Sequence, residues 1–427
     1  MSGPLLLAAT TIAFRGATLI DGTGAPPVPN SLLVISDGRI VSVGLATEEA
    51  VTRLPPGTQV ITADTKWVLP GFIDAHVHAE SEQDLKTMLN WGVTSARLMA
   101  EDVAAASALA KTSGARTDIP EVFPAAPIFT AKGGWWDQGQ PPDANLNRFP
   151  TMPAEARESV RKAKALGARE IKVMLDDMAW CRAPKAPLPK LPPDVVEALI
   201  AEARAQGMRA TVHAPNAADA KLAIAAGATA LAHGVLDPLD DATIAVMKSR
   251  PVFYIPTMDI FEFLADTRGF VGGIVARPVE GMLTPETLVR LRSPEYAAGY
   301  RERYPNFDGV KRRLPVLREN LRKLHAAGVP VALGTDMWAF PGLAVSVEMD
   351  LYVKAGLSPL EVIRAATQTA ARSLEIDHDR GTLEPGRRAD LLVLRSDPVQ
   401  GAGHLREIDG IWKNGARVGP TAERRGP

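Results

Sequence analysis

Several histidines directly follow apolar runs, and they are the residues of this sequence best suited to bind a metal ion. His76 and His78 form an H-x-H pair, and in extended backbone residues i and i+2 point to one side, so both imidazoles can reach one ion. His213 and His233 each end a later apolar run. Neutral imidazole is the commonest metal donor in proteins, and zinc suits it. The alternative for each histidine is a solvated loop or a hydrogen-bonded core position.

Two charged residues stand in apolar surroundings elsewhere in the chain. Asp336 follows an apolar run, where a carboxylate is costly unless it is paired or bound to a metal. Lys172 interrupts the apolar run 170–175. Burial lowers the pKa of an amine, and a free amine can react with carbon dioxide to give an anionic carbamate whose two oxygens can bridge two cations. The alternative for Lys172 is an ion pair with Asp176 or Asp177.

Eight short apolar runs would position these residues, and several of them follow a helical pattern that ends at a glycine. Glycine at that point accepts the left-handed conformation that terminates a helix. Apolar strands that alternate with helices predict an α/β fold with a parallel sheet, and eight of them predict a (β/α)8 TIM barrel with its active site at the carboxyl ends of the strands. An open doubly wound sheet is the alternative. The predicted strands span 68–73, 93–99, 122–129, 170–175, 209–213, 229–233, 252–256 and 331–333.

The two ends of the chain differ from its middle, because both are rich in β-type runs and turn signals. Residues 1–67 and 382–427 are predicted to form one small composite β-sandwich domain, and residues 68–381 the barrel. An insertion at about 260–325 separates predicted strands seven and eight. Long insertions of this kind form active-site lids, or else surface decorations and oligomer contacts.

The composition of the chain limits the classes of partner that we expect for it. The chain has 427 residues with a formal net charge of −1, so we expect no nucleic acid and no membrane partner. A small-molecule substrate and a homo-oligomer are expected separately. Cys181 is the only cysteine, which excludes an intramolecular disulfide. The N-terminal apolar run lacks a basic start, so a cytoplasmic location is predicted, with a removed signal peptide as the alternative.

Several motifs together resemble the amidohydrolase superfamily, in particular its imidazolonepropionase-like and prolidase-like branch. The run PGFIDAHVH at 70–78 is similar to the first-strand motif of that family, and LGTD at 333–336 to its last-strand motif. The segments at 17–24, 37–44 and 381–394 are similar to its β-domain. The resemblance covers nearly the whole chain, and the order H-x-H, Lys, His, His, Asp is specific to the family.

The resemblance implies two divalent metal ions per chain, zinc first, with manganese, cobalt or iron as alternatives. A water bridging two such ions loses a proton near neutral pH and becomes the nucleophile. The proton of this water would pass through Asp336 to the leaving amine, and His233 would also take part in catalysis. Tyr254 would assist the carbonyl oxygen of the substrate; the alternative for Tyr254 is a position in the core. The implied metal ligands are His76, His78 and Asp336 for the more buried ion, His213 and His233 for the second, and carboxylated Lys172 as the bridge.

The implied activity is hydrolysis of an amide C–N bond in an N-acyl amino acid, a Xaa-Pro-like peptide or an aryl amide. The alternatives are a mononuclear cyclic-amide hydrolase or deaminase with a structural Lys172, a lactone, ester or organophosphate hydrolase, and a non-catalytic scaffold relative. Where relatives carry a Gly-Gly-His-Gly stretch, this chain has KGGWW at 132–136, which predicts an aromatic wall or, alternatively, buried packing. The expected substrate-binding residues are Trp135, Trp136, Tyr254, Met337 and Trp338.

Overall fold

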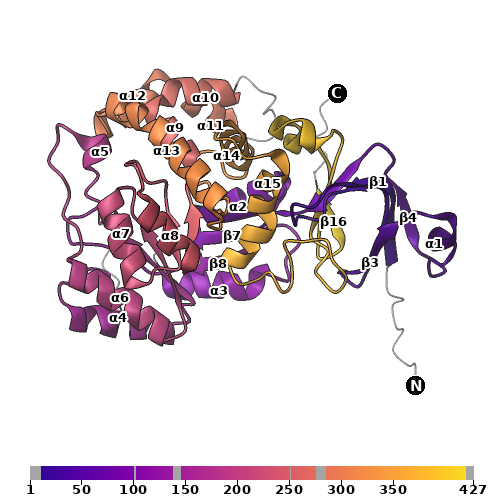
Figure 1. The fold of residues 1–427 in the computed structure, drawn as a ribbon, viewed down its shortest axis with the longest axis horizontal. Coiled ribbons are helices and arrows are strands. Elements are labelled where there is room, and N and C mark those ends of the chain that lie inside the picture. The colour runs from indigo at the N-terminus through magenta and orange to yellow at the C-terminus, as the bar shows by residue number, and fades with distance from the viewer. Residues whose placement is uncertain (1–10, 101, 138–145, 251, 276–284, 420–427) are drawn as a thin grey trace.

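A sheet built from both ends of the chain lies beside a larger body of helices and parallel strands (Figure 1). The computed structural model describes residues 11–100, 102–137, 146–250, 252–275 and 285–419. The terminal sheet has eight strands in the order β16-β15-β14-β5-β1-β2-β3, with β4 paired to β1. These strands are β1 (Thr11–Leu19), β2 (Val28–Ser36), β3 (Arg39–Leu45), β4 (Gln59–Thr62), β5 (Trp67–Pro70), β14 (Leu391–Leu394), β15 (Ile408–Lys413) and β16 (Ala416–Gly419).

The core of this terminal sheet joins residues from the two ends of the chain. Phe14 and Trp412 meet edge to face, with ring centroids 4.8 Å apart, and Leu33 and Leu391 are fully buried in the same cluster. Burial of such large apolar side chains is the main favourable term in folding. Both termini therefore contribute to one sheet, while the domain boundaries at 67/68 and 381/382 stay a prediction.

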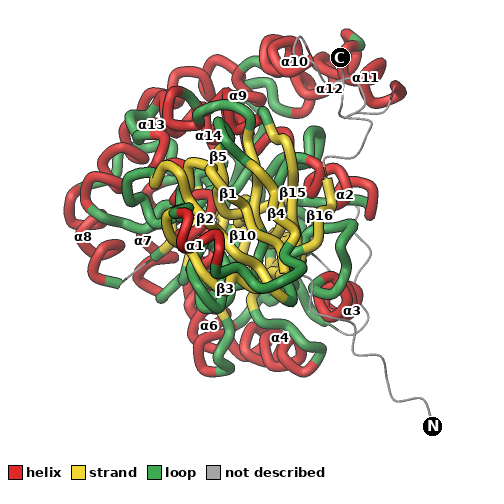
Figure 2. Tube along the Cα trace, turned by 90° about the vertical axis from the view of Figure 1, so that its right-hand side faces the viewer, coloured by secondary structure: helices red, strands yellow, loops and turns green. Residues whose placement is uncertain are grey.

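Eight further strands form two parallel sheets. One sheet has the order β6-β7-β8 and the other β13-β12-β11-β10-β9. Figure 2 is viewed from the side of the terminal sheet and shows its strands in the centre, together with β10 of the parallel strands, and helices around them. The strands are β6 (Phe72–Val77), β7 (Val93–Met99), β8 (Glu121–Ala125), β9 (Ile128–Phe129), β10 (Glu170–Met174), β11 (Arg209–His213), β12 (Ala230–Ala232) and β13 (Phe253–Ile255).

The helices alternate with these strands, as the sequence pattern predicts. Gly227 and Gly328 end α7 and α13 with φ values of 97° and 85°, the left-handed conformation expected at those positions. None of the described helices is long and apolar enough to cross a membrane. The helices are α1 (Glu48–Thr52), α2 (Glu82–Asn90), α3 (Val103–Ser113), α4 (Pro153–Ala165), α5 (Ala179–Arg182), α6 (Pro193–Ala205), α7 (Ala217–Ala226), α8 (Asp241–Ser249), α9 (Met258–Ala265), α10 (Thr267–Val275), α11 (Pro285–Arg292), α12 (Pro294–Arg303), α13 (Phe307–Ala327), α14 (Leu343–Lys354), α15 (Pro359–Arg364) and α16 (Ala370–Ser373).

Two predicted strands are each divided in two by the structure. The run 68–73 separates at Gly71 into β5, which belongs to the terminal sheet, and β6, which starts the parallel strands. A Cβ at Gly71 would lie 2.3 Å from Thr94 Oγ1, so the chain turns from one sheet to the other where only glycine fits. The run 122–129 divides at Ala126 and Pro127 into β8 and β9.

The predicted strand 331–333 is present only as an isolated parallel bridge between Tyr254 and Val331. Its backbone is nevertheless bonded on both sides. Ala332 N donates to Tyr254 O of β13 at 3.0 Å, and Ala75 N of β6 donates to Leu333 O at 2.8 Å. This segment therefore connects the two parallel sheets and brings the residues after it to the ends of β6 and β13.

Candidate active site

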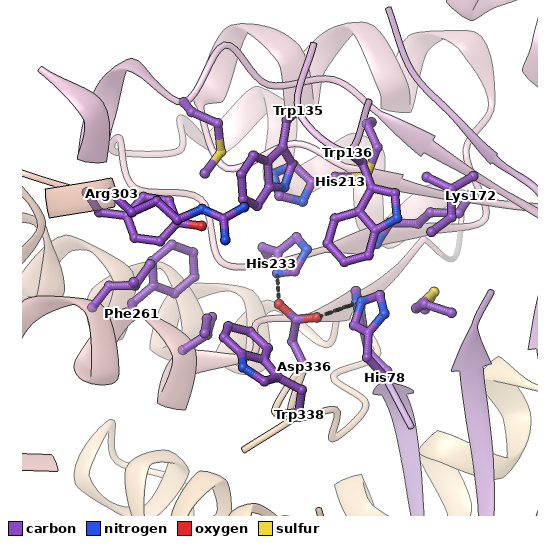
Figure 3. Close-up of a pocket in the computed structure, with 18 of the residues that line it drawn as sticks. His78, Trp135, Trp136, Lys172, His213, His233, Phe261, Arg303, Asp336 and Trp338 are labelled. Carbon is purple, nitrogen blue, oxygen red and sulfur yellow. Dashed lines mark ion pairs between the residues drawn. The ribbon is translucent and has the colours of Figure 1, made fainter. Parts of the chain in front are cut away.

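The carboxyl ends of the parallel strands surround a cavity of about 420 Å³, a volume ordinary for a small-molecule site. Six residues from four strands or their ends, and from the segment after residue 333, line this cavity together (Figure 3). Side chains far apart in sequence meet here because parallel strands present their carboxyl ends at one edge. The six are His76, His78, Lys172, His213, His233 and Asp336.

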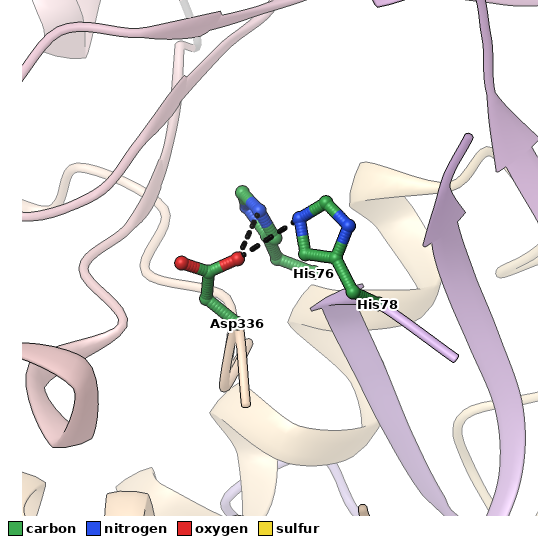
Figure 4. A group of neighbouring side chains, drawn as sticks. All are labelled: His76, His78 and Asp336. Atoms are coloured by element: carbon green, nitrogen blue, oxygen red, sulfur yellow. Dashed lines mark ion pairs between the residues drawn. The ribbon is translucent and has the colours of Figure 1, made fainter. Parts of the chain in front are cut away.

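Three of these side chains converge on one point. His76 Nε2 and His78 Nε2 each lie 3.1 Å from the same carboxylate oxygen, Asp336 Oδ1 (Figure 4). One ligand atom from each of the three lies within 4.8 Å of the others. Two imidazole nitrogens and a carboxylate oxygen form a donor set that suits zinc and related divalent ions. The three residues could therefore hold one cation.

The other two histidines lie beside this group and are oriented by their neighbours. The rings of His213 and His233 are 4.1 Å apart, and the ring of His233 is 4.8 Å from that of His76. His213 Nε2 lies 2.9 Å from Asp176 Oδ2, which leaves its Nδ1 without a hydrogen-bond partner among the described residues. His233 Nδ1 lies 2.9 Å from Thr257 Oγ1, which leaves Nε2 as its second nitrogen. Partners of this kind fix the orientation of metal-binding imidazoles.

Lys172 is 2% exposed, and its Nζ has no hydrogen-bond partner in the described part of the chain. The acids proposed as its alternative partners are otherwise engaged: Asp176 contacts His213 and Trp180, and Asp177 accepts the N–H of Ala179. Burial lowers the pKa of Lys172 to about 7. A neutral fraction of the amine, the form that can react with carbon dioxide, is thus present near pH 7.

The electrostatics of the pocket suit a cation. Burial, followed by the nearby Lys172, lowers the pKa of His76 to about 3, so its imidazole is neutral. Burial alone would raise the pKa of Asp336, but the neighbouring His76 and His233 hold it well below its usual value. Neutral imidazoles and an ionised carboxylate are the protonation states that bind metal.

Asp74 and Gly334 hold the two strand ends together behind the cavity. The Asp74 carboxylate accepts the backbone N–H of His76 at 3.1 Å and both the N–H and the hydroxyl of Thr335, at 3.1 and 2.8 Å. A Cβ at Gly334 would lie 2.8 Å from His76 Cβ, so glycine permits this approach. The bond network and the close contact together place Asp336 against His76.

The backbone at this edge is strained. His233, Thr257 and Asp336 have φ values of 72°, 43° and 55°, the left-handed region that non-glycine residues rarely adopt. The turn that contains Thr257 is anchored by Glu348 of α14, whose buried carboxylate accepts the N–H groups of Met258 and Asp259, both at 2.8 Å. Glu348 therefore positions the hydroxyl that orients His233.

Aromatic side chains form the outer wall. Trp135, Trp136 and Trp338 line the cavity, and the rings of Trp136 and His78 are 4.8 Å apart. Tyr254 and Met337 do not line it. Tyr254 is fully buried with its hydroxyl accepting the N–H of Val235, and Met337 is fully buried in the core. Both positions match core packing, which is the alternative given for Tyr254.

The sequence analysis offered an active-site lid as one role of the insertion but named none of the insertion residues that line the cavity. Helices α9 and α12 bring Phe261, Tyr300, Arg303 and Tyr304 into the cavity wall. A signal was available, because Tyr296, Tyr300 and Tyr304 are spaced by four residues and a helix places such residues on one face.

Comparison with known proteins identifies the family to which this chain belongs. The model of the Amidohydrolase family matches residues 67–420, and the chain belongs to this family. Ochratoxinase from Aspergillus niger is 26% identical over 485 positions that cover 98% of this chain and 91% of that protein. Imidazolonepropionase from Deinococcus deserti is 38% identical over 106 residues, 23% of this chain and 26% of that protein.

Solved structures agree with this family assignment at the level of the fold. A Xaa-Pro dipeptidase with methionine bound in its active site matches with a TM-score of 0.75 and 23% identity, covering 96% of this chain and 99% of that one. The Aspergillus niger ochratoxinase structure matches with a TM-score of 0.74 and 22% identity, covering 96% and 95%. The chain therefore has the fold of the amidohydrolases, and the predicted resemblance is confirmed.

The buried acid that anchors the Thr257 turn predicts a pH-dependent stability. Burial raises the pKa of Glu348 to about 8, above its ordinary 4.5, so the folded protein binds this proton more tightly than the unfolded chain. The resulting stabilisation is complete below pH 4.5 and is lost as the pH rises through 8. Between about pH 5 and about pH 9, the free energy of unfolding of the wild type should fall by roughly 2 kcal/mol or more relative to Glu348→Gln.

Urea unfolding of both proteins in the presence of a chelator measures this difference. Parallel pH profiles for the wild type and the variant would show that Glu348 does not titrate as described.

Proposed function

We propose that the protein is a metal-dependent amidohydrolase that cleaves the amide C–N bond of a small molecule. The observation that carries this proposal is the convergence of six potential ligands on one cavity, including the buried amine of Lys172, for which the described residues offer no hydrogen-bond partner. Membership in the Amidohydrolase family supports hydrolysis of C–N bonds. Relatives named ochratoxinase and Xaa-Pro dipeptidase support the same reaction class.

We infer that the two parallel sheets and the segment 330–333 form one closed (β/α)8 barrel. The hydrogen bond from Ala126 N to Glu170 O, 3.0 Å long, joins the first sheet to the second. The hydrogen bonds from Ala332 N to Tyr254 O and from Ala75 N to Leu333 O join both sheets through the segment 330–333. A closed ring of this kind would leave no unpaired strand edge and would hold its ligands in fixed positions. The eighth strand would be short because Gly334 and the left-handed Asp336 end it.

Two divalent ions fit the donors present. His76, His78 and Asp336 would hold the first ion, and His213 Nδ1 with the remaining Nε2 of His233 would hold the second. Lys172, once carboxylated by carbon dioxide with loss of a proton, would lie between them. Its neutral amine and its burial support this modification. Zinc is the first expectation from the imidazole-rich set, with manganese, cobalt and iron as alternatives.

In the proposed reaction, an amide and water give a carboxylic acid and an amine. Divalent ions at this site would supply an activated water and polarise the scissile carbonyl. Asp336 accepts the proton from the attacking water and delivers it to the leaving nitrogen, a transfer that general acid–base groups accelerate by about 10²- to 10⁴-fold. Asp176 and Thr257 keep the imidazoles of His213 and His233 in place during the reaction. The aromatic wall excludes water from the bound substrate.

A hydrolysis screen tests this function. Protein loaded with zinc or manganese should hydrolyse at least one member of a set of N-acyl amino acids, Xaa-Pro dipeptides and anilides, followed by release of the amine. Chelation should abolish turnover and metal should restore it, since the hydrolysis depends on the ions. Turnover of lactones or phosphotriesters with no amide cleaved would contradict the proposal.

The role of Lys172 is tested by metal content. Lys172→Ala removes the bridging group, so the metal bound per chain should fall from about two ions to about one or fewer. Plasma mass spectrometry after dialysis measures this ratio, and circular dichroism checks the fold. Lys111→Ala, an exposed lysine of α3, is the matched control and should keep about two ions. Two ions in Lys172→Ala would show that Lys172 is not the bridge.

A further inference from the structure

The outer half of the cavity is built by the insertion, and its side chains differ in character from those of the strand ends. Tyr300 of α12 stacks on Tyr304 and on Trp338, with centroids 6.3 Å apart in both pairs. Trp338 Nε1 donates to the Tyr300 hydroxyl at 3.1 Å, and Trp135 meets Tyr304 at 6.0 Å. These contacts fix a continuous aromatic surface opposite the strand ends. Such a surface accepts the faces and edges of a planar ring.

The positively charged side chain of Arg303 lies on this aromatic surface. The Arg303 guanidinium lies 5.4 Å from the ring centroid of Trp135 and 5.5 Å from that of Tyr304. Arg303 lines the cavity, and it forms no ion pair with a carboxylate of the described residues. Figure 3 shows Arg303 on the side of the pocket away from Lys172. A guanidinium stacked on aromatic rings keeps its edge free, and this edge matches a carboxylate with two parallel hydrogen bonds.

Arg303 offers a substrate anion a positively charged partner on the side of the cavity away from Lys172 (Figure 3). Glu80, in the loop two residues after His78, also lines the pocket. Its carboxylate repels a negative group there. Arg303, on the insertion, is the position where a substrate carboxylate gains a favourable partner. A substrate would then span the cavity, with its scissile amide at Asp336 and its carboxylate at Arg303.

We propose that Arg303 is a specificity-determining residue that binds a carboxylate of the substrate, so that the protein selects anionic amides with an aromatic group, the class of N-acyl aromatic amino acids. This inference rests on the proposed function, because it assumes that the amide lies at Asp336. Carboxylate binding is equal in the bound substrate and in the transition state. It therefore lowers KM and leaves kcat nearly unchanged.

Two substrates that differ only in the carboxylate test the inference: N-benzoyl-phenylalanine and N-benzoyl-phenethylamine. Arg303→Gln should raise KM for the acid about tenfold, with kcat within about twofold, because one charge-assisted contact is lost. The same variant should leave KM for the neutral amide unchanged. Arg301→Gln is the matched control: it removes the same charge from the same helix, where Arg301 lies over Phe307 and does not line the cavity.

Calorimetric binding of N-benzoyl-phenylalanine gives a second readout that does not depend on turnover. The wild type and Arg301→Gln should bind it alike, and Arg303→Gln about tenfold more weakly. Equal effects of Arg303→Gln on the acid and the neutral amide, or no effect on either, would overturn the role of Arg303 and leave the proposed function standing. Binding that depends on Arg303 without cleavage of any amide would contradict the proposed function and leave the anion site standing.

Discussion

The proposed active site depends on buried polar atoms that have no hydrogen-bond partner among the described residues, because such atoms are costly to remove from water. Lys172 Nζ and His213 Nδ1 are removed from water and have no hydrogen-bond partner among the described residues, and an unpaired buried polar group costs about 1–3 kcal/mol. Proteins keep such groups where something else satisfies them. A divalent cation would satisfy His213 Nδ1 directly, and carboxylation of Lys172 would convert its amine into an anionic group that such ions bind. Burial lowers the pKa of His76 and His233, so these imidazoles are neutral, and Asp336 is ionised; these are the protonation states that a metal ion requires.

The rest of the molecule holds these costly groups in position. Asp74 joins the ends of β6 and the segment before Asp336, Asp176 orients His213, and the turn anchored by Glu348 orients His233 through Thr257. The strands thus supply the chemistry. The insertion supplies the aromatic and cationic surface that faces the strand ends. Differences in such insertions and loops explain how one fold can serve different substrates. The terminal sheet adds a separate core and contributes no residue to the cavity lining.

The sequence predicted the strand-end residues well because two local rules determine them. Strand ends follow from helices that end at glycine, and parallel strands bring their carboxyl ends to one edge, so His213, His233 and Asp336 had to converge. The division of the run 68–73 was not predicted, because it depends on the contact of Gly71 with Thr94 across two sheets. Tyr254 was placed correctly on its strand, but its side chain direction depends on the partner Val235. The insertion could not be placed, since its helices are positioned only by tertiary contacts such as Phe263 with Tyr300.

The most direct test of the metal centre is anomalous X-ray diffraction at the zinc absorption edge from crystals of the zinc-loaded protein. Two anomalous peaks should appear in the cavity, one beside His76, His78 and Asp336 and the other beside His213 and His233, with extra density that extends Lys172 Nζ between them. A single peak with an unmodified Lys172, or zinc bound only outside this cavity, would contradict the binuclear centre.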